Sequence, residues 1–281
     1  MNIIYITGLS RSGTTYLSKE LVNSLNALSI GESIKNIEIW QDEKELKRYQ
    51  EENRKCTCGK HPTECPFWRD ILCESEAKDK KEVFDLILRK VRDEYEGSIV
   101  IDTSKSVSRL KEFYSESVIK KYGINLVVVN IIRHCCGQIE SYQSYHKKWN
   151  RTGVKASILA DAVYWAYKNY KNLKFLRDNK KPTLTIIYED LVFEKRRTLE
   201  IISQFVDRNM KDCQKTIPTM HEMGGNEGFK KQSNFNVKYN AAWMFNPKLT
   251  RYSILLSPFM CLNSFWHKKY GIEKRNKHDT K

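Results

Sequence analysis

Long hydrophobic runs are missing from this sequence of 281 residues. A membrane-spanning helix needs about 18 or more consecutive apolar residues, and the longest apolar runs here, within residues 126–132 and 254–262, are much shorter. The first expected strand begins near residue 3, which leaves no room for a signal peptide. We therefore expect a cytoplasmic protein without a membrane span, in which the cysteines are reduced.

Acidic residues are too few to balance the basic ones. The 49 Lys and Arg residues exceed the 34 Asp and Glu residues and give a net charge of +15. Such a charge attracts nucleotides, nucleic acids, acidic glycans or anionic membranes, and it does not choose among them. The 40% hydrophobic content indicates a globular chain. Since repeats and linkers are also absent, we expect a single domain over 1–281, with a Cys-containing lid insertion at 30–75 and a basic tail at 268–281.

The clearest motif lies at the start of the chain. Residues 3–6 are apolar and read as a buried strand, and residues 8–13 read as a tight loop. Leucines then recur at the four-residue spacing of one helix face, at positions 17, 21 and 25. A loop between a strand and a helix N-terminus binds anions, because backbone N–H groups and the helix dipole converge on it.

The loop has the spacing of a Walker A motif but not its lysine. Gly8 and Gly13 are separated by four residues, and Thr14 stands where that motif has lysine. The cation of the loop is Arg11 instead. We expect the loop to hold phosphate without the lysine that reaches the β/γ-phosphates of a nucleoside triphosphate. A degenerate loop of a kinase or NTPase is the alternative interpretation.

Residues 8–15, Gly-Leu-Ser-Arg-Ser-Gly-Thr-Thr, resemble the 5′-phosphosulfate loop of sulfotransferases that use PAPS (3′-phosphoadenosine 5′-phosphosulfate). Loops of that family carry Lys or Arg directly before Ser-Gly-Thr. The resemblance implies that Arg11 and the loop N–H groups stabilise charge on the bridging and leaving phosphate oxygens. It also implies that Thr14 and Thr15 donate to the 5′-phosphate and that Tyr16 stacks on the adenine. The nucleotide-binding residues expected here are Ser10, Arg11, Ser12, Gly13, Thr14, Thr15 and Tyr16.

A second motif follows the most convincing buried strand, at residues 125–132, which is apolar on both faces. Arg133 ends this strand, and Ser141 comes eight residues later in an expected helix over 138–149. In sulfotransferases an Arg and a Ser at these positions bind the 3′-phosphate of PAPS, so the resemblance implies that role for Arg133 and Ser141. The planar arginine fork matches two phosphate oxygens. An ordinary ion pair is the alternative for Arg133 alone.

Polar residues follow the expected strand at 98–102, at the strand end where open α/β sheets bind ligands. The segment Asp-Thr-Ser-Lys resembles one found in bacterial sulfotransferases. Cytosolic members of the family have a catalytic histidine in this region, and that histidine is absent here. We expect Asp102 to be the general base, with Glu32 or Glu38 as alternatives. Lys105 is expected to touch the transferring sulfuryl group.

Two later segments extend the resemblance. The strand at 182–187 ends in Tyr188-Glu-Asp-Leu, and in the family that tyrosine lies near the nucleotide. Residues 221–231 are rich in glycine and basic residues, which suits a phosphate site. They resemble a late Gly-Asn segment that closes over the 3′-phosphate, which implies that role for Asn226 and for Lys230 or Lys231.

Three cysteines and one histidine lie within ten residues, at Cys56, Cys58, His61 and Cys65. They could supply four zinc ligands, although Cys-x-Cys is tighter than the usual Cys-x₂-Cys. Unligated thiols and a disulfide are the alternatives. The segment resembles an insertion of some bacterial sulfotransferases, which would cap the acceptor side. Because the loop already neutralises the leaving group, no obligatory metal is expected for the reaction.

Taken together, the resemblance covers residues 2–271 and predicts an α/β fold. It implies a P-loop-type parallel sheet flanked by helices in three layers, with lid insertions. The implied enzyme is a sulfotransferase that moves a sulfuryl group from PAPS to a hydroxyl or amine and releases PAP. A small molecule, a glycan or a lipid could be the acceptor. A P-loop kinase or NTPase needs the missing lysine, and a basic nucleic-acid-binding protein needs basic and aromatic residues grouped on one face.

Overall fold

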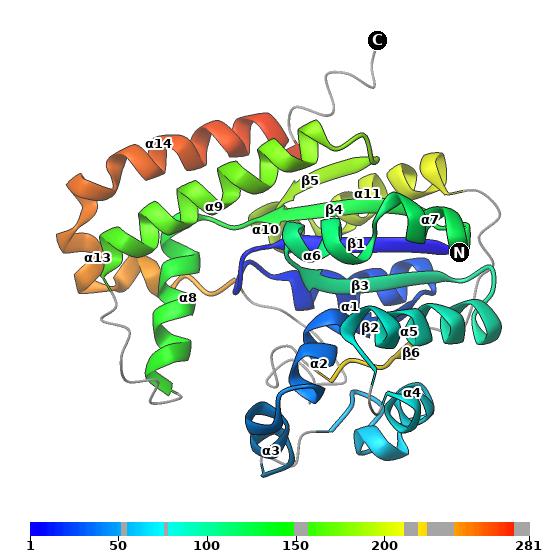
Figure 1. Ribbon diagram of the computed structural model, residues 1–281. Coiled ribbons are helices and arrows are strands. Elements are labelled where there is room, and N and C mark those ends of the chain that lie inside the picture. Colours follow the sequence, from blue (N-terminus) through cyan, green and yellow to red (C-terminus); the bar gives the residue numbers. More distant parts are fainter. Residues whose placement is uncertain (52–54, 76–77, 149–156, 211–218, 224–238, 273–281) are drawn as a thin grey trace. The chain divides into compact units, whose positions relative to one another are not determined.

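The structure is a computed structural model that describes residues 1–51, 55–75, 78–148, 157–210, 219–223 and 239–272. Within these residues, six strands form a parallel sheet in the order β5-β4-β1-β3-β2-β6 (Figure 1). The strands are β1 (Asn2–Gly8), β2 (Leu28–Gly31), β3 (Ile99–Lys105), β4 (Asn125–Ile132), β5 (Thr183–Ile187) and β6 (Thr219–Met220). The expected α/β fold, a parallel sheet flanked by helices, is confirmed.

The chain forms two compact units. Unit 1 comprises Met1–Thr7, Thr15–Val128 and Ser203–Asn234, and unit 2 comprises Gly8–Thr14, Val129–Ile202 and Phe235–Lys281. The glycine-bounded loop therefore belongs to unit 2, whereas the Cys-containing segment belongs to unit 1. The single domain over 1–281 stays a prediction.

In unit 1, β3 lies between β1 and β2. Asn2 is aligned with Ile99 and Tyr5 with Asp102 across β1 and β3, and Leu28 is aligned with Val100 across β2 and β3. Nearly all side chains of these strands are buried, which explains their continuous apolar sequence. The register shifts near the ends of both pairs, so the polar residues that follow leave the regular ladder.

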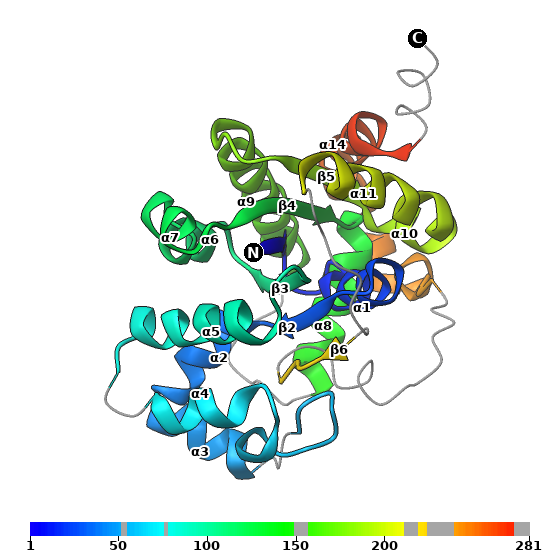
Figure 2. The same ribbon diagram turned by 90° about the vertical axis from the view of Figure 1, so that its right-hand side faces the viewer.

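Helices of unit 1 pack around these strands. They are α1 (Thr14–Leu25, whose first residue is in unit 2), α2 (Ser33–Trp40), α3 (Glu43–Glu51), η1 (Pro62–Glu64), α4 (Trp68–Glu74), α5 (Lys80–Glu94), α6 (Val107–Phe113) and α7 (Glu116–Tyr122). Figure 2 shows α4 beside α5, and α2 packs on both α5 and β3. Helix α5 begins with a capping box, in which Asp79 accepts from the backbone of Glu82 and Glu82 accepts from Asp79.

Unit 2 is built on β5 and the last part of β4. Its helices are α8 (Cys135–Lys148), α9 (Ile158–Asp178), α10 (Tyr188–Phe193), α11 (Lys195–Asn209, which continues into unit 1), η2 (Ala242–Phe245), α13 (Pro247–Arg251) and α14 (Ser253–Tyr270). Helix α9 packs on α8 and α14 (Figure 1), and the rings of Trp165 and Trp266 lie 5.0 Å apart in that core. Helix α8 begins three residues before the expected start at 138, because Cys135 and Cys136 are buried in the core. Among the described residues, no helix combines the length and apolar character needed to cross a membrane.

Candidate functional site

The loop after β1 has the backbone shape of an anion site. Arg11 has φ 70° and Gly13 has φ 102°, a region that non-glycine residues seldom adopt. The backbone N–H of Ser12 donates to the carbonyl of Leu9 at 3.1 Å, which closes a tight turn. A Cβ at position 13 would lie 2.3 Å from Cδ2 of Tyr188. Only glycine fits there, because the tyrosine ring packs directly on the loop backbone.

Arg133 joins the end of β4 to the same loop. Its Nη1 donates to the backbone carbonyl of Arg11 at 3.0 Å, and its guanidinium group lies 4.6 Å from the centre of the Tyr188 ring. The backbone carbonyl of Arg133 accepts from Nε1 of Trp165, so core packing fixes the residue from behind. Its Nε is buried and has no hydrogen-bond partner within the described ranges.

Arg11 reaches helix α8. Its Nε donates to Oγ of Ser141 at 3.1 Å, and its guanidinium lies 5.1 Å from the centre of the Tyr145 ring. Burial, and then the neighbouring charge of Arg133, lowers the pKa of Arg11. In the part of the chain that the structure describes, neither arginine forms an ion pair with a carboxylate. A half-buried and a buried cation thus share one loop, with no carboxylate ion pair among the described residues.

Helix α8 contributes two residues that sequence reasoning missed. Gln138 donates from Nε2 to the carbonyl of Ser10 at 3.1 Å, and Tyr145 lies against Arg11. Gln138, Ser141 and Tyr145 are spaced three and four residues apart, which places them on one helix face. The spacing of these residues relative to Ser141 is the sequence signal that indicates them.

The donors at this loop suit a polyanionic ligand. Oγ of Ser12 and Nε of Arg133 are buried without partners among the described residues, and an unpaired buried polar atom is costly. A phosphate group would accept from both kinds of donor and would offset the two arginine charges. The structure therefore brings Ser10, Arg11, Ser12, Gly13, Arg133, Ser141 and Tyr188 together in unit 2.

The remaining nucleotide-binding expectations have mixed outcomes. Thr14 is buried and Thr15 half-buried at the start of α1. Tyr16 is buried, at 4% exposure, and its stacking role stays a prediction. Asn226 and Lys230 lie outside the described residues.

Asp102, the expected general base, is enclosed in unit 1. It is fully buried and accepts hydrogen bonds of 2.8 Å from the hydroxyls of Ser33 and Tyr114 and from the backbone N–H of Ser104. Burial raises the pKa of Asp102, and the three hydrogen bonds oppose that shift. A carboxylate that already accepts three protein donors is better suited to holding strand ends in place than to receiving a proton.

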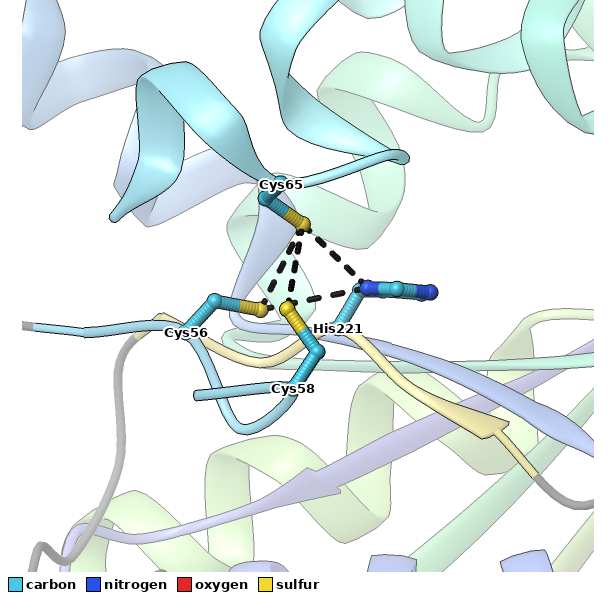
Figure 3. Close-up of side chains that lie close together, drawn as sticks. All are labelled: Cys56, Cys58, Cys65 and His221. Carbon is cyan, nitrogen blue, oxygen red and sulfur yellow. Dashed lines mark hydrogen bonds between the residues drawn. The ribbon is translucent and has the colours of Figure 1, made fainter. Parts of the chain in front are cut away.

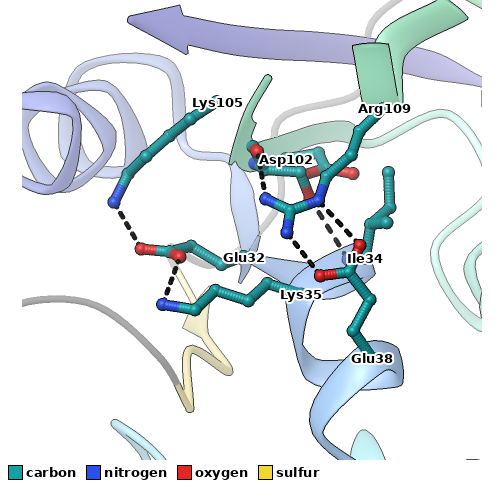
Figure 4. Close-up of polar contacts among 8 residues, drawn as sticks. Glu32, Ile34, Lys35, Glu38, Asp102, Lys105 and Arg109 are labelled. Carbon is teal, nitrogen blue, oxygen red and sulfur yellow. Dashed lines mark hydrogen bonds and ion pairs between the residues drawn. The ribbon is translucent and has the colours of Figure 1, made fainter. Parts of the chain in front are cut away.

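Lys105 and Glu32 meet where β3 and β2 end (Figure 4). Nζ of Lys105 binds Oε1 of Glu32, and Lys35 approaches Oε2 at 3.3 Å. Burial alone would raise the pKa of Glu32, but the charges of Lys105 and Lys35 outweigh it and lower the pKa to about 2. Lys105 has φ 64°, a strained backbone that the ion pair holds in place.

A second ion pair stands beside the first. Arg109 donates from Nε to Glu38 at 3.1 Å and also binds its other oxygen through Nη2, and Nη1 donates to the carbonyl of Ser104 at 3.3 Å (Figure 4). The two alternative bases, Glu32 and Glu38, are therefore each engaged by a cation. Sequence reasoning did not find this pairing, because the partners come from different elements.

The expected zinc ligands are only partly brought together. Cys56, Cys58 and Cys65 lie close together in unit 1, but Nδ1 of His61 is hydrogen-bonded with Oγ1 of Thr63 at 2.7 Å. The imidazole beside the sulfurs belongs to His221, and the ligand set needs this correction. The structure also contradicts the disulfide alternative, since all three cysteines are free.

The chain is similar to known proteins in sequence and in fold. A sequence model described as "Sulfotransferase family" matches residues 3–212. The sulfotransferase domain from the Synechococcus PCC 7002 olefin synthase has 18% identity, a TM-score of 0.46 and a match that covers 73% of each chain. The sulfotransferase domain from the curacin biosynthetic pathway has 18% identity and a TM-score of 0.45, and the match covers 73% of this chain and 74% of that one. A search of the curated proteins found no match.

Proposed function

The chain belongs to the sulfotransferase family, and on this premise we propose that it transfers a sulfuryl group from PAPS to a hydroxyl or amine of an acceptor and releases PAP. One observation carries the proposal. Arg11 and Arg133 converge on a glycine-bounded loop with no carboxylate partner among the described residues. Such a pair needs an anion, and PAPS presents both a phosphosulfate and a separate 3′-phosphate.

The loop residues are proposed to bind the phosphosulfate end. Arg11 and the loop N–H groups other than that of Ser12, which already donates to Leu9, hold the 5′-phosphate oxygens and stabilise the charge that grows on them. Thr14 and Thr15, at the N-terminus of α1, add donors beside the helix dipole. PAPS, when bound, supplies the activated sulfuryl group. No lysine stands in the loop to reach a γ-phosphate.

Arg133 and Ser141 are proposed to select the 3′-phosphate. Arg133 still has Nε and Nη2 to offer after Nη1 has bonded the loop carbonyl, and two parallel donors match two phosphate oxygens. Tyr188 lies against both Arg133 and Gly13, so it fixes the guanidinium plane. The hydrogen bond between Arg11 and Ser141 links the two proposed phosphate positions.

For the general base we propose Glu32. Both carboxylates are buried. Asp102 already accepts from three protein hydroxyl and N–H donors, whereas Glu32 is held by the cations Lys105 and Lys35, which the sulfuryl oxygens can draw away so that it accepts a proton. Glu32 is bound to Lys105, the residue proposed to touch the sulfuryl group. A shift of Lys105 toward the sulfuryl oxygens would remove a positive charge from Glu32 and raise the pKa of its carboxylate, which makes it a better proton acceptor. Glu38 is the alternative, and comparing the Glu32→Gln and Glu38→Gln variants in PAPS turnover distinguishes the two.

Calorimetric titration tests the proposed donor. We expect the full chain to bind PAP with micromolar affinity, independently of Mg²⁺ and at least about tenfold more tightly than ADP. The physical reason is that Arg133 and Ser141 would bind the 3′-phosphate, which ADP lacks. Mg²⁺-dependent binding that favours ADP would contradict the proposal and point to a kinase or NTPase. Turnover is then measured with PAPS and a panel of small-molecule, glycan and lipid acceptors.

A further inference from the structure

Three thiols and one imidazole converge in unit 1. Figure 3 shows the side chains of Cys56, Cys58, Cys65 and His221 pointing toward one centre. The sulfurs and Nδ1 of His221 all lie within 4.8 Å of one another. Cys56, Cys65 and His221 are buried, and Cys58 is exposed, so the cluster sits just below the surface.

The distances are those of a tetrahedral metal site. Sγ of Cys65 lies 3.6 Å from Sγ of Cys56 and 3.7 Å from Sγ of Cys58. Zinc binds sulfur at about 2.3 Å, which separates two sulfurs of a tetrahedron by about 3.8 Å and a sulfur and a nitrogen by about 3.5 Å. Nδ1 of His221 lies 3.2 Å from the sulfur of Cys65 and 3.9 Å from that of Cys56. These two distances lie on either side of the sulfur–nitrogen separation of about 3.5 Å expected for a tetrahedron. A disulfide would need about 2.05 Å.

The local backbone holds each cysteine in place. Gly59 has φ 85° and donates to the carbonyl of Cys56 at 2.9 Å, and Cys56 donates to the carbonyl of Lys60 at 3.0 Å. The Cys-x-Cys-Gly sequence therefore forms a tight turn that aims both sulfurs the same way. The sulfur of Cys65 accepts from the backbone N–H groups of Phe67 and Trp68, where α4 begins, and these bonds fix its position.

His221 is fixed as firmly as the cysteines. Its backbone N–H donates to the carbonyl of Ser29 at 2.7 Å and extends the pairing of β6 with β2. Its carbonyl accepts from Nε1 of Trp68 at 2.6 Å, and its ring stacks on Phe67 at 5.7 Å. These contacts hold the backbone and the ring plane of His221 in place.

We propose that Cys56, Cys58, Cys65 and Nδ1 of His221 bind one zinc ion. Three thiolates and an imidazole in a tetrahedron are typical zinc ligands. All four positions are filled by protein, so the site is closed and its role is structural. The proposal does not depend on the proposed function, since it needs neither PAPS nor an acceptor.

The zinc ion would join segments that lie far apart in the sequence. It would tie the 56–68 segment to the strand edge at His221, and the next residue, Glu222, accepts a hydrogen bond from Ser18 of α1 at 2.8 Å and one from Ser29 of β2 at 2.5 Å. The backbones of Thr57 and Glu222 are also bonded at 3.0 Å. Metal binding would thus fix the edge strand β6 against β2, the strand that leads to Glu32.

Metal analysis of the full chain, purified without chelator, tests the site. We expect one zinc per chain, and we expect the Cys65→Ser and His221→Ala variants to lose it. His61→Ala is the matched control, because His61 lies near the cysteines in sequence but outside the cluster, and it should keep the zinc. Wild-type protein that contains no zinc after purification in zinc-supplemented buffer would overturn the proposal. Metal loss in His61→Ala with retention in His221→Ala would overturn the ligand set.

Cobalt substitution keeps the test decisive if a variant fails to fold. The wild-type chain loaded with Co²⁺ should show the intense visible bands of a tetrahedral site and the near-ultraviolet charge-transfer bands of thiolate ligands. His221→Cys retains four ligands, so it should bind the metal and shift the visible bands. Octahedral, weak bands in the wild-type protein would exclude the site. A unit-stoichiometry zinc site in a chain that fails to bind PAP would leave this inference intact and refute only the proposed donor.

Discussion

The loop in unit 2 and the strand ends in unit 1 differ in how their charges are matched. At the loop, the half-buried Arg11 lies beside the buried Arg133, and partial burial, followed by the charge of Arg133, lowers the pKa of Arg11. At the strand ends the two cations, Lys105 and Arg109, each have a carboxylate partner. Those ion pairs are Lys105–Glu32 and Arg109–Glu38. The positive charge at the loop needs an external anion, whereas the cations at the strand ends are paired with carboxylates of the protein itself.

This difference predicts opposite responses to substitution. Buried charges without partners cost folding free energy, so removing one from the loop should harm ligand binding or turnover and leave stability unchanged or improved. Removing one member of a buried ion pair leaves the other uncompensated, so the strand-end region should lose stability. Measuring turnover or ligand affinity together with the free energy of unfolding for each variant therefore tests whether the loop and the strand ends differ in this way.

The largest effect is expected for Arg11→Ala. Turnover with PAPS should fall by about 10²–10³-fold, because one donor to a developing negative charge is lost, while PAP affinity falls by less than about tenfold. Steady-state kinetics and PAP titration measure the two. The control is Arg251→Ala, which removes an exposed cation of α13. A loss of PAP affinity as large as the loss of turnover would contradict a transition-state role.

The next effect is a pH dependence of stability from Glu32. Its pKa of about 2 in the folded chain lies below the ordinary value of 4.5, so the folded state favours the ionised form. The stabilisation is complete above about pH 4.5 and is lost as the pH falls toward 2, and its size is about 3 kcal/mol. Glu32→Gln should lower the free energy of unfolding at neutral pH by about that amount and flatten the acid-side decline. Urea unfolding at a series of pH values measures both.

Glu38→Gln is the control for that prediction. The Glu38 side chain is 34% exposed beside Arg109, so solvent screens the pair and its loss should cost about 1 kcal/mol or less. If the acid-side curves of wild type and Glu32→Gln run parallel, the ion pair with Lys105 does not stabilise the fold, and the contrast between the two regions disappears.

Local sequence predicted which residues meet at the loop, and their roles in ligand binding stay predictions. Gly8–Gly13 spacing, Arg133 at a strand end and Ser141 two turns into the next helix are all short-range patterns, because backbone geometry fixes where such residues point. Asp102 was assigned as a base from its place at a strand end. Its enclosure depends on Ser33 and Tyr114, which belong to other elements and which spacing along β3 does not reveal.

The cysteine cluster also depends on a contact between distant segments that sequence spacing does not reveal. His61 was the natural fourth ligand because it lies between Cys58 and Cys65 in the sequence. The histidine that joins them, His221, lies on the edge strand and is brought there by the pairing of β6 with β2. Proximity in sequence predicts contact within a turn or a helix, but strand pairing brings together residues that no spacing rule connects.

A smaller effect is expected for Arg133→Ala. PAP affinity should fall by about 10–100-fold, because charge-assisted hydrogen bonds to the 3′-phosphate are lost, while 5′-AMP affinity falls by a few-fold at most. Competitive titration of the two nucleotides measures the ratio. Stability should not decrease, since Arg133 has no carboxylate partner among the described residues. Equal losses for PAP and 5′-AMP would remove Arg133 from the 3′-phosphate site.

The smallest effect is expected for Ser141→Ala. PAP affinity should fall by about fivefold, because one hydrogen bond to the ligand is lost. Ser144→Ala is its control, because Ser144 lies one turn later on the same helix and bonds only to Glu140 among the described residues. A double-mutant cycle with Arg11→Ala sharpens the result. If Ser141 binds the 3′-phosphate itself, its effect persists without Arg11. If Ser141 serves only to position the Arg11 guanidinium, to which it is hydrogen-bonded at 3.1 Å, the effect vanishes in the Arg11→Ala background. In that case the two arginines alone carry the charge recognition of the loop.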